Sequence, residues 1–146
     1  VDELIEQLRK ILGKNEIQKT VIVGAGHIGK ALMNYNGFEA GGIEIMAGFD
    51  TDPAKYSEDP KVLPFEDFRE YVKNNSIKIG ILAVPDYVAQ QVAEIMVSSG
   101  IKGILNFAPI QLRVSGDVII NNINLEVELE NLIYFVNAGI QSEDLN

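Results

Sequence analysis

The sequence contains no cysteine. A chain without thiols forms no disulfide framework and no thiolate metal site, and it has no cysteine nucleophile, which suits a reducing, cytoplasmic setting. Long apolar runs are also missing, because none approaches the roughly 18 residues that a membrane-spanning helix requires. Residues 1–19 are charged and hold no apolar signal core, so we expect a cytoplasmic protein with no membrane partner.

Basic residues are scarce as well. The chain has 12 Lys and Arg against 21 Asp and Glu, which gives a formal net charge of -9. Such a chain repels the phosphates of nucleic acids, so it is a poor candidate for binding DNA or RNA by itself. Its 146 residues are 47% hydrophobic, enough for one well-packed domain but not for a second catalytic domain of ordinary size.

Apolar runs of strand length alternate with helical patterns through the middle of the chain. Strands that are apolar on both faces are typical of a parallel sheet covered by helices. The alternation predicts an α/β fold with a doubly wound, Rossmann-like parallel sheet. We expect strands at 20–24, 43–50, 78–84, 101–107 and 117–122, and helices at 27–35, near 65–74 and at 86–99.

The two ends of the chain carry further helical patterns. Residues 1–12 place apolar side chains at helical spacing before Gly13, and no capping residue precedes them, so we expect the natural protein to extend upstream. The expected organisation is a linker helix in 1–19, a Rossmann domain in 20–122, and a C-terminal dimerisation helix with its tail in 123–146.

The last helical pattern, 124–139, follows a sheet that already looks complete. A helix that is apolar around much of its circumference requires burial on more than one side. Two partners satisfy this requirement: its own sheet, or a second subunit, as in a domain-swapped homodimer. The apolar stripe consists of Leu125, Leu129, Leu132, Ile133 and Val136, with Val127, Tyr134 and Phe135 outside it.

A glycine-rich stretch, TVIVGAGHIGKAL, covers residues 20–32. Gly24 would permit a tight turn after the strand, Gly26 would let the backbone approach a pyrophosphate, and Gly29 would let the helix pack closely. The N-terminus of that helix would face the phosphates. A lone motif of this kind is weak evidence, and a glycine turn that binds nothing is the alternative.

An acidic residue strengthens the motif. Asp50 ends the next predicted strand, 21 positions after Gly29, where a carboxylate accepts hydrogen bonds from the adenosine ribose. Its negative charge would repel a 2′-phosphate and favour NAD over NADP. Asp52, Glu58 and Asp59 follow within ten residues, but their spacing lacks the order of a calcium loop, so we expect no metal site there.

Two further segments end predicted strands, where ligands bind in open α/β sheets. In AVPD, 83–86, Pro85 suits either a ligand contact or simple helix initiation. In NFAP, 106–109, Asn106 and Phe107 would offer an amide and a ring to a nicotinamide, or would form a plain strand exit.

Catalytic machinery is missing from the sequence pattern. A dehydrogenase needs an acid or base to move the substrate proton. The only histidine, His27, lies inside the glycine loop, where it would be placed over the pyrophosphate and not over a nicotinamide. Tyr35 and Tyr56 are possible acids, but no Tyr-x-x-x-Lys pairing occurs. A cofactor site without a catalyst favours a sensor over an enzyme.

The motifs taken together resemble those of the redox-sensing transcriptional repressor family Rex. The similarity covers residues 4 to 136, and GIKGILNFAP with NYNGF is far more specific than the glycine motif alone. The motifs that carry it are VGAGHIGKALMNYNGF, FDTDPAK, VP, AQQVAEIMVSSGIKGILNFAP and NLEVELENLIYF.

The resemblance implies a fold, a cofactor and partners. In that family an upstream winged-helix domain binds operator DNA, a Rossmann domain binds NADH or NAD, and a C-terminal helix is swapped within a homodimer. NADH closes the dimer and releases DNA. The implied NAD(H) contacts in this chain are Gly24, Ala25, Gly26, His27, Ile28, Gly29, Asp50, Lys55, Val84, Pro85, Asn106, Phe107 and Ala108.

The resemblance also implies a switch between subunits, formed by Tyr35 and the start of the partner's swapped helix, Asn124 and Leu125. The family commonly has an aspartate where this chain has Asn124. An asparagine would still hydrogen-bond to Tyr35, but it cannot form the charged pair with arginine implied for the DNA-bound state.

Two other functions compete with the sensor. One is the cofactor domain of a dehydrogenase whose substrate domain lies elsewhere. The other is a CoA-binding Rossmann domain of the succinyl-CoA-synthetase type. Asp50 argues against CoA, because a carboxylate is unfavourable beside the ribose 3′-phosphate of CoA.

Overall fold

The computed structural model describes residues 2–4 and 17–139 of the chain. In this part the strands form one seven-stranded sheet in the order β3-β4-β2-β1-β5-β6-β7. All neighbouring strands are parallel except β3, which pairs antiparallel with β4. The strands are β1 Gln18–Val23, β2 Ile43–Asp50, β3 Ser57–Glu58, β4 Lys61–Pro64, β5 Ile79–Leu82, β6 Gly103–Asn106 and β7 Ile119–Asn122.

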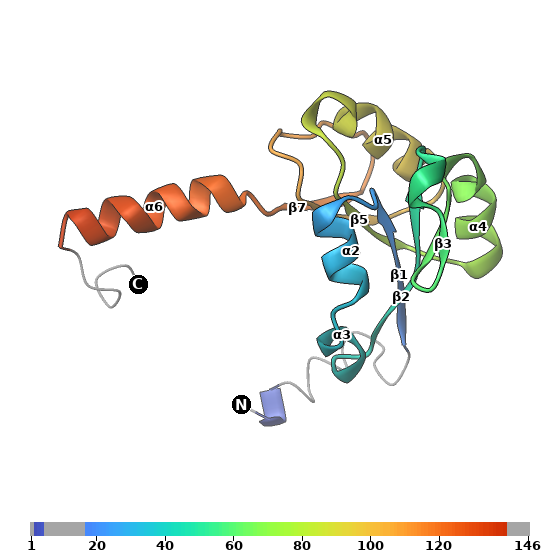
Figure 1. Ribbon diagram of the computed structural model, residues 1–146, viewed down its shortest axis with the longest axis horizontal. Helices are drawn as coiled ribbons and strands as arrows, with labels where there is room; N and C mark the ends of the chain where they lie inside the picture. Colours follow the sequence, from blue (N-terminus) through green and yellow to red (C-terminus); the bar gives the residue numbers. More distant parts are fainter. Residues whose placement is uncertain (1, 5–16, 140–146) are drawn as a thin grey trace.

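Helices lie on both faces of this sheet. Helix α2 lies on one face, and α4 and α5 lie on the other (Figure 1). The arrangement confirms the predicted doubly wound α/β fold. The helices are α2 His27–Met33, α3 Gly37–Ala40, α4 Phe68–Asn75, α5 Asp86–Ser98 and α6 Leu125–Asn137, with short 3-10 turns η1 Pro53–Lys55 and η2 Phe65–Asp67.

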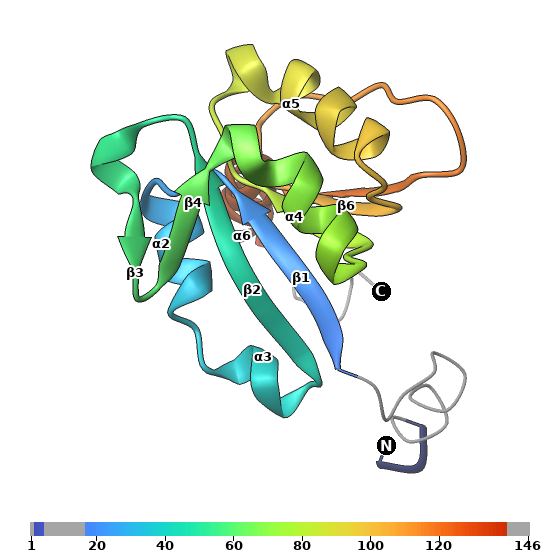
Figure 2. The ribbon, with the colours of Figure 1, turned by 90° about the vertical axis from the view of Figure 1, so that its right-hand side faces the viewer.

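The direction of winding reverses at β1. From β1 the chain moves outward to β2 and β4 (Figure 2). It then returns to β5 on the other side of β1 and continues to β6 and β7. The loops after β1, β2 and β5 therefore diverge at one end of the sheet and leave a crevice. Ligands bind at such a switch point in open α/β sheets.

The hydrophobic core on the α4 and α5 face is built around aromatic side chains. Phe49 of β2 lies edge-to-face against Phe68 at 5.1 Å and against Tyr71 at 5.3 Å between ring centroids. Both phenylalanines are fully buried. Because Phe49 directly precedes Asp50, this packing fixes the end of β2 where the predicted ribose contact stands.

Two elements of the sheet were not predicted. Strand β4 occupies the position beyond β2, and its sequence KVLP is short and carries a proline and a lysine, so it lacks a strand signal. Proline is tolerated at Pro64 because it is the last residue of the strand. The two-residue β3 only covers the outer edge of β4. The predicted helix near 65–74 is divided into η2 and α4.

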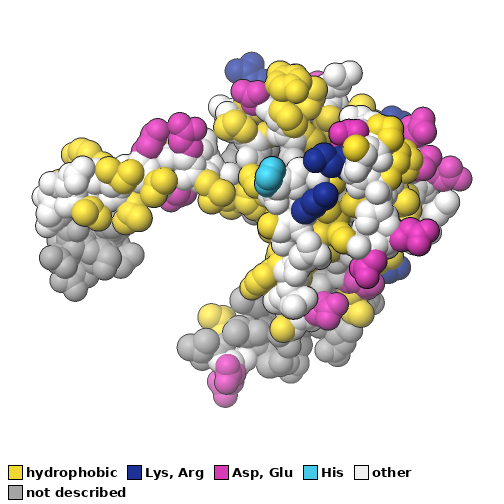
Figure 3. Space-filling view, in the orientation of Figure 1, with side chains coloured by type: hydrophobic (Ala, Val, Ile, Leu, Met, Phe, Trp, Pro, Cys, Tyr) yellow, Lys and Arg dark blue, Asp and Glu magenta, His cyan; other side chains and the backbone are white. Residues whose placement is uncertain are grey.

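Helix α6 projects away from the sheet (Figure 1). The possibility that it packs on its own sheet is therefore wrong for this structure. Its apolar side chains gather along one side of the helix and acidic ones along the other (Figure 3), and Leu132 is 58% exposed. The predicted helix over 1–12 lies outside the described residues except for 2–4, which are helical. Among the helices described, none has the length and hydropathy needed to cross a membrane.

We expect Phe68→Ala to lower the free energy of unfolding by about 3–5 kcal/mol, because it removes a fully buried ring that contacts Phe49. Chemical denaturation monitored by circular dichroism measures this change. Tyr87→Ala is the control, since Tyr87 is 84% exposed and its removal should change stability by less than about 0.5 kcal/mol. An equal effect of both substitutions would contradict the core described here.

Candidate nucleotide-binding site

The turn after β1 depends on two glycines. Gly24 has a φ of 106°, a conformation that side chains rarely adopt, and a Cβ there would collide with the carbonyl oxygen of Ala83. A Cβ on Gly29 would collide with the carbonyl oxygen of Gly24. These contacts bring α2 directly onto the turn, as the sequence pattern predicts for a dinucleotide loop.

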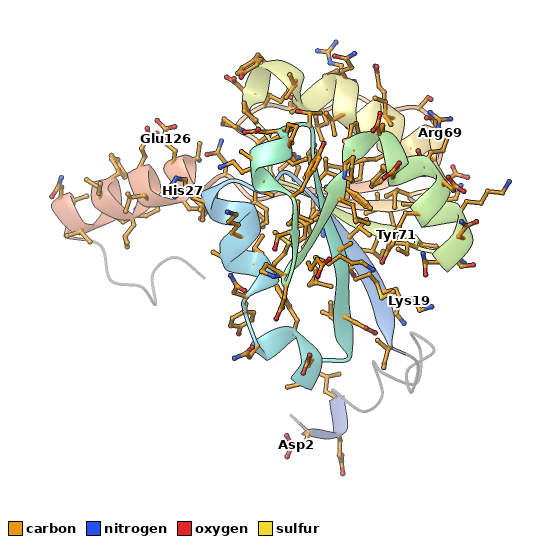
Figure 4. The ribbon with its side chains drawn as sticks, turned by 45° about the vertical axis from the view of Figure 1, so that its right-hand side comes forward. Asp2, Lys19, His27, Arg69, Tyr71 and Glu126 are labelled. Atoms are coloured by element: carbon orange, nitrogen blue, oxygen red, sulfur yellow. The ribbon has the colours of Figure 1, made fainter. Side chains whose placement is uncertain are left out.

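Gly26 differs from the other two, because no heavy atom beyond its two chain neighbours lies within 4 Å of the position of a Cβ there. It precedes α2 and offers no side chain to cap the N–H groups of the first turn. His27, the first residue of α2, is exposed and stands at the end of the helix that faces the turn (Figure 4). The backbone at Gly26 is thus open to a ligand without any rearrangement of the protein.

Asp50 ties the glycine turn to the end of β2. Its Oδ2 accepts a hydrogen bond of 2.8 Å from the backbone N–H of Ala25, and its Oδ1 accepts one of 2.9 Å from the N–H of Asp52. The backbone N–H of Gly24 also donates to the carbonyl oxygen of Phe49 at 2.7 Å. Both carboxylate oxygens are therefore held in a fixed orientation, and each keeps lone pairs for further donors.

A cavity of about 560 Å³ opens at this point, between the glycine turn, the loop after β2 and helix α5. This volume is in the range of small-molecule and cofactor sites. Six of the implied contacts line it: Gly24, Gly26, Asp50, Lys55, Val84 and Pro85. The remaining lining residues are Val23, Phe49, Thr51, Asp52, Phe65, Ala83, Tyr87, Val88, Gln91, Val92 and Ile95.

Sequence reasoning missed most of the α5 wall of the cavity. Val88, Gln91, Val92 and Ile95 stand at positions i, i+3, i+4 and i+7, so they share one face of the helix. That spacing is visible in the sequence, but it is also the pattern of an ordinary core-facing helix. Phe65 lies at the start of the helix predicted near 65–74, and nothing in that pattern indicates that its ring lines a cavity.

Charge at the site is predominantly negative. Asp50 and Asp52 stand beside one cation, Lys55, in the cavity lining. Desolvation raises the pKa of the nearby Tyr56, and the carboxylates of Glu66, Asp50, Asp52 and Asp67 raise it further. The Tyr56 phenol therefore stays protonated at neutral pH. A ligand that donates hydrogen bonds is favoured near Asp50, and an additional phosphate is not.

Asn106 does not present its amide to this cavity. It is fully buried, its Nδ2 donates to the carbonyl oxygen of Ile110 and to Oδ1 of Asn122, and its Oδ1 accepts from the N–H of Ala108. The hydrogen-bonding groups of this amide are therefore engaged within the chain, and its contact with a nicotinamide stays a prediction. The amide fixes the backbone that leaves β6, and contacts from Phe107 and Ala108 stay predictions.

The residues of the implied switch lie apart from the cavity lining. Tyr35 is 59% exposed and lies edge-to-face against Phe38 at 4.9 Å. Asn124 caps α6, since its Oδ1 accepts from the N–H of Val127 at 3.1 Å. Among the described residues, no hydrogen bond joins Tyr35 to Asn124 within this chain, so their pairing across subunits stays a prediction.

The acidic residues after β2 form no metal site in the described part of the chain, where no group of three or more His, Asp or Glu side chains has the arrangement to hold an ion. Asp52 has a structural role instead, because its Oδ1 accepts from the N–H of Ala54 and caps η1.

Comparison with known proteins identifies close relatives. Residues 15–110 match the family described as CoA binding domain. A redox-sensing transcriptional repressor Rex from Carboxydothermus hydrogenoformans is 44% identical over 92% of this chain and 66% of its own length. The Rex of Desulforamulus reducens is 42% identical over 92% of this chain and 65% of its own length. This chain therefore spans about 65% of the length of such relatives.

Solved structures give the same result. The Rex-family repressor RSP superposes with a TM-score of 0.84 at 38% identity, covering 94% of this chain and 68% of that chain. The structure of RSP in complex with β-NADH gives a TM-score of 0.85 at 36% identity, covering 99% of this chain and 72% of that chain. RSP has also been solved in complex with β-NAD+ and operator DNA, with a TM-score of 0.85 at 38% identity over 94% of this chain and 65% of that chain. The chain belongs to the CoA-binding domain family and to the Rex family of redox-sensing transcriptional repressors.

Proposed function

We propose that this chain is the NAD(H)-binding regulatory domain of a redox-sensing transcriptional repressor. The observation that carries the proposal is the carboxylate of Asp50, held by the N–H groups of Ala25 and Asp52 at the mouth of the cavity. In this position it meets the ribose hydroxyls of a dinucleotide whose pyrophosphate lies at Gly26. The complexes of RSP with β-NADH and β-NAD+ support the choice of ligand.

The cofactor contacts divide along the cavity. The backbone from Gly24 to Gly29 receives the pyrophosphate, Asp50 receives the adenosine ribose, and Lys55 offsets part of the negative charge at that end. Val84 and Pro85 line the wall formed by the loop after β5. Phe107 and Ala108 follow β6, the next strand along the sheet, and lie on the side proposed for the nicotinamide.

Regulation belongs to the whole protein. Operator DNA is bound by a winged-helix domain upstream of this chain, and NADH binding releases the DNA from a cytoplasmic homodimer. The chain is a sensor rather than an enzyme, which agrees with its Rex relatives. In the dimer, α6 inserts into the partner, and Tyr35 meets Asn124 and Leu125 at the start of the partner's helix.

CoA is the second candidate ligand, because residues 15–110 match the CoA-binding domain family. The electrostatics of the cavity disfavour it. The 3′-phosphate of CoA would stand beside Asp50, with Asp52 close by, and Lys55 is the one cation in the lining. Like charges at this spacing cost binding energy, whereas ribose hydroxyls gain hydrogen bonds to the same carboxylate.

Calorimetric titration tests the ligand. We expect the chain to bind NADH at least about 100-fold more tightly than NADPH or CoA, since each of these adds a ribose phosphate next to Asp50. Asp50→Ala should reduce NADH affinity by about 10- to 100-fold, through loss of charge-assisted hydrogen bonds to the ribose. Preferential binding of CoA would contradict the proposal and establish the second candidate.

The control for Asp50→Ala is Glu39→Gln, which removes the same charge from α3, outside the cavity. This variant should bind NADH within about twofold of the parent chain, since surface charges act weakly at a distance in salt. A second check is the melting temperature of Asp50→Ala, because the substitution also removes the acceptor of the Ala25 N–H.

Substitutions of Gly26 and Gly29 should separate the effect on cofactor binding from the effect on the stability of the fold. Gly26→Ala should change the free energy of unfolding by less than about 0.5 kcal/mol, since its Cβ meets no protein atom, but it should abolish measurable NADH binding by occupying the pyrophosphate position. Gly29→Ala should destabilise the fold by about 2 kcal/mol or more, because its Cβ collides with the Gly24 carbonyl. Tight NADH binding by a stable Gly26→Ala variant would contradict the assigned role.

Sedimentation velocity tests the homodimer. We expect a dimer that Leu129→Asp or Leu132→Asp converts to monomer, because each substitution places a charge in the middle of an apolar stripe that is exposed in the single chain and that the dimer would bury. Glu130→Gln is the matched control on the same helix and should remain dimeric. A parent chain that is monomeric at about 50 μM would remove the role assigned to α6, and a dimer unaffected by either substitution would place the interface elsewhere.

A further inference from the structure

The α5 wall of the cavity carries one carboxamide among aliphatic side chains. Val88, Gln91, Val92 and Ile95 share the face of α5 that lines the cavity, and Phe65 lines it from η2. Three of these four helix residues offer only hydrocarbon. Tyr87, which is 84% exposed, also lines the cavity from the first turn of α5, so Gln91 supplies the one carboxamide of this wall.

The side of the cavity formed by α5 is the part that remains for the base of the dinucleotide. With the pyrophosphate at Gly26 and the ribose at Asp50, the rest of the adenosine must continue into the space bounded by Phe65 and α5. An aromatic and three aliphatic side chains suit the faces of a purine. The assignment of the base to this space rests on the proposed dinucleotide function.

Two adjacent glutamines have different environments. Gln90 is fully engaged with the protein, since its Nε2 donates to the carbonyl oxygen of Arg113 at 2.6 Å and its Oε1 accepts from the N–H of Arg113 at 2.9 Å. Gln91 makes no side-chain hydrogen bond to the described part of the chain, and it lies at the cavity. Its donor and acceptor are both available to a ligand.

We propose that Gln91 reads the purine of the dinucleotide and selects adenine over hypoxanthine. The edge of adenine offers a donor at N6 and an acceptor at N7, and a carboxamide matches both, with Oε1 accepting from N6 and Nε2 donating to N7. Hypoxanthine has an acceptor in place of the N6 amino group. Oε1 then faces another oxygen, and one hydrogen bond is replaced by repulsion.

The test compares NADH with reduced nicotinamide hypoxanthine dinucleotide, which differs from it only at the base. Affinities are measured by calorimetry for the parent chain and for Gln91→Met, which keeps the length of the side chain and removes its hydrogen bonds. We expect the parent to prefer NADH by about 10-fold or more, and Gln91→Met to bring the ratio of the two affinities close to 1.

Gln90→Met is the matched control. It breaks both hydrogen bonds to Arg113 and should lower the melting temperature, yet it should leave the ratio of the two affinities unchanged. A parent chain without preference, or a preference that survives in Gln91→Met, would overturn the role of Gln91 while leaving NADH binding intact. Failure of the parent to bind NADH at all would instead overturn the proposed function, and this inference with it.

Discussion

The hydrogen bond from the Ala25 N–H to the Asp50 carboxylate joins the two loops on which the site depends. One loop follows β1 and holds the glycine turn, and the other follows β2 and continues into η1. Because the winding of the chain reverses at β1, these loops diverge at the carboxyl end of the strands. A backbone hydrogen bond from the Gly24 N–H to the Phe49 carbonyl oxygen also ties the glycine turn to β2. The second oxygen of Asp50 fixes the Asp52 N–H, so a single carboxylate sets the geometry of turn, loop and cavity mouth.

The core and the site are connected through β2. The ring of Phe49 lies edge-to-face against the rings of Phe68 and Tyr71, both on α4, and Asp50 is the next residue of the strand. On the other side of β1, the buried amide of Asn106 fixes the exit from β6 by three hydrogen bonds. Because these contacts hold the strand ends in place, the short loops that follow them lose little conformational entropy when a ligand binds.

Sequence patterns predicted those features of the structure that require a particular residue type for a single physical reason. Gly24 and Gly29 are required by steric contacts, and Asp50 by its place after a buried strand, so all three were found. Strand β4 was missed because KVLP has too few apolar residues to signal a strand. Helices were predicted near 65–74 and at 86–99, but nothing in their patterns shows that Phe65 and the α5 side chains line a cavity. Asn106 was placed at the correct strand end, but one of its three hydrogen bonds is to Asn122 of β7, sixteen residues later, which a local pattern does not contain. The apolar stripe of α6 was identified from its spacing and is exposed in the structure, whereas its burial by a second subunit stays a prediction.

The central claim is that the cavity at the switch point holds an NAD(H) molecule with its ribose on Asp50. A crystal structure of the chain grown with NADH tests this most directly. The account predicts the pyrophosphate over Gly26, the adenosine ribose hydroxyls within hydrogen-bond distance of the Asp50 carboxylate, and the adenine along α5. A dinucleotide bound elsewhere, or an adenosine whose ribose makes no contact with Asp50, would contradict it.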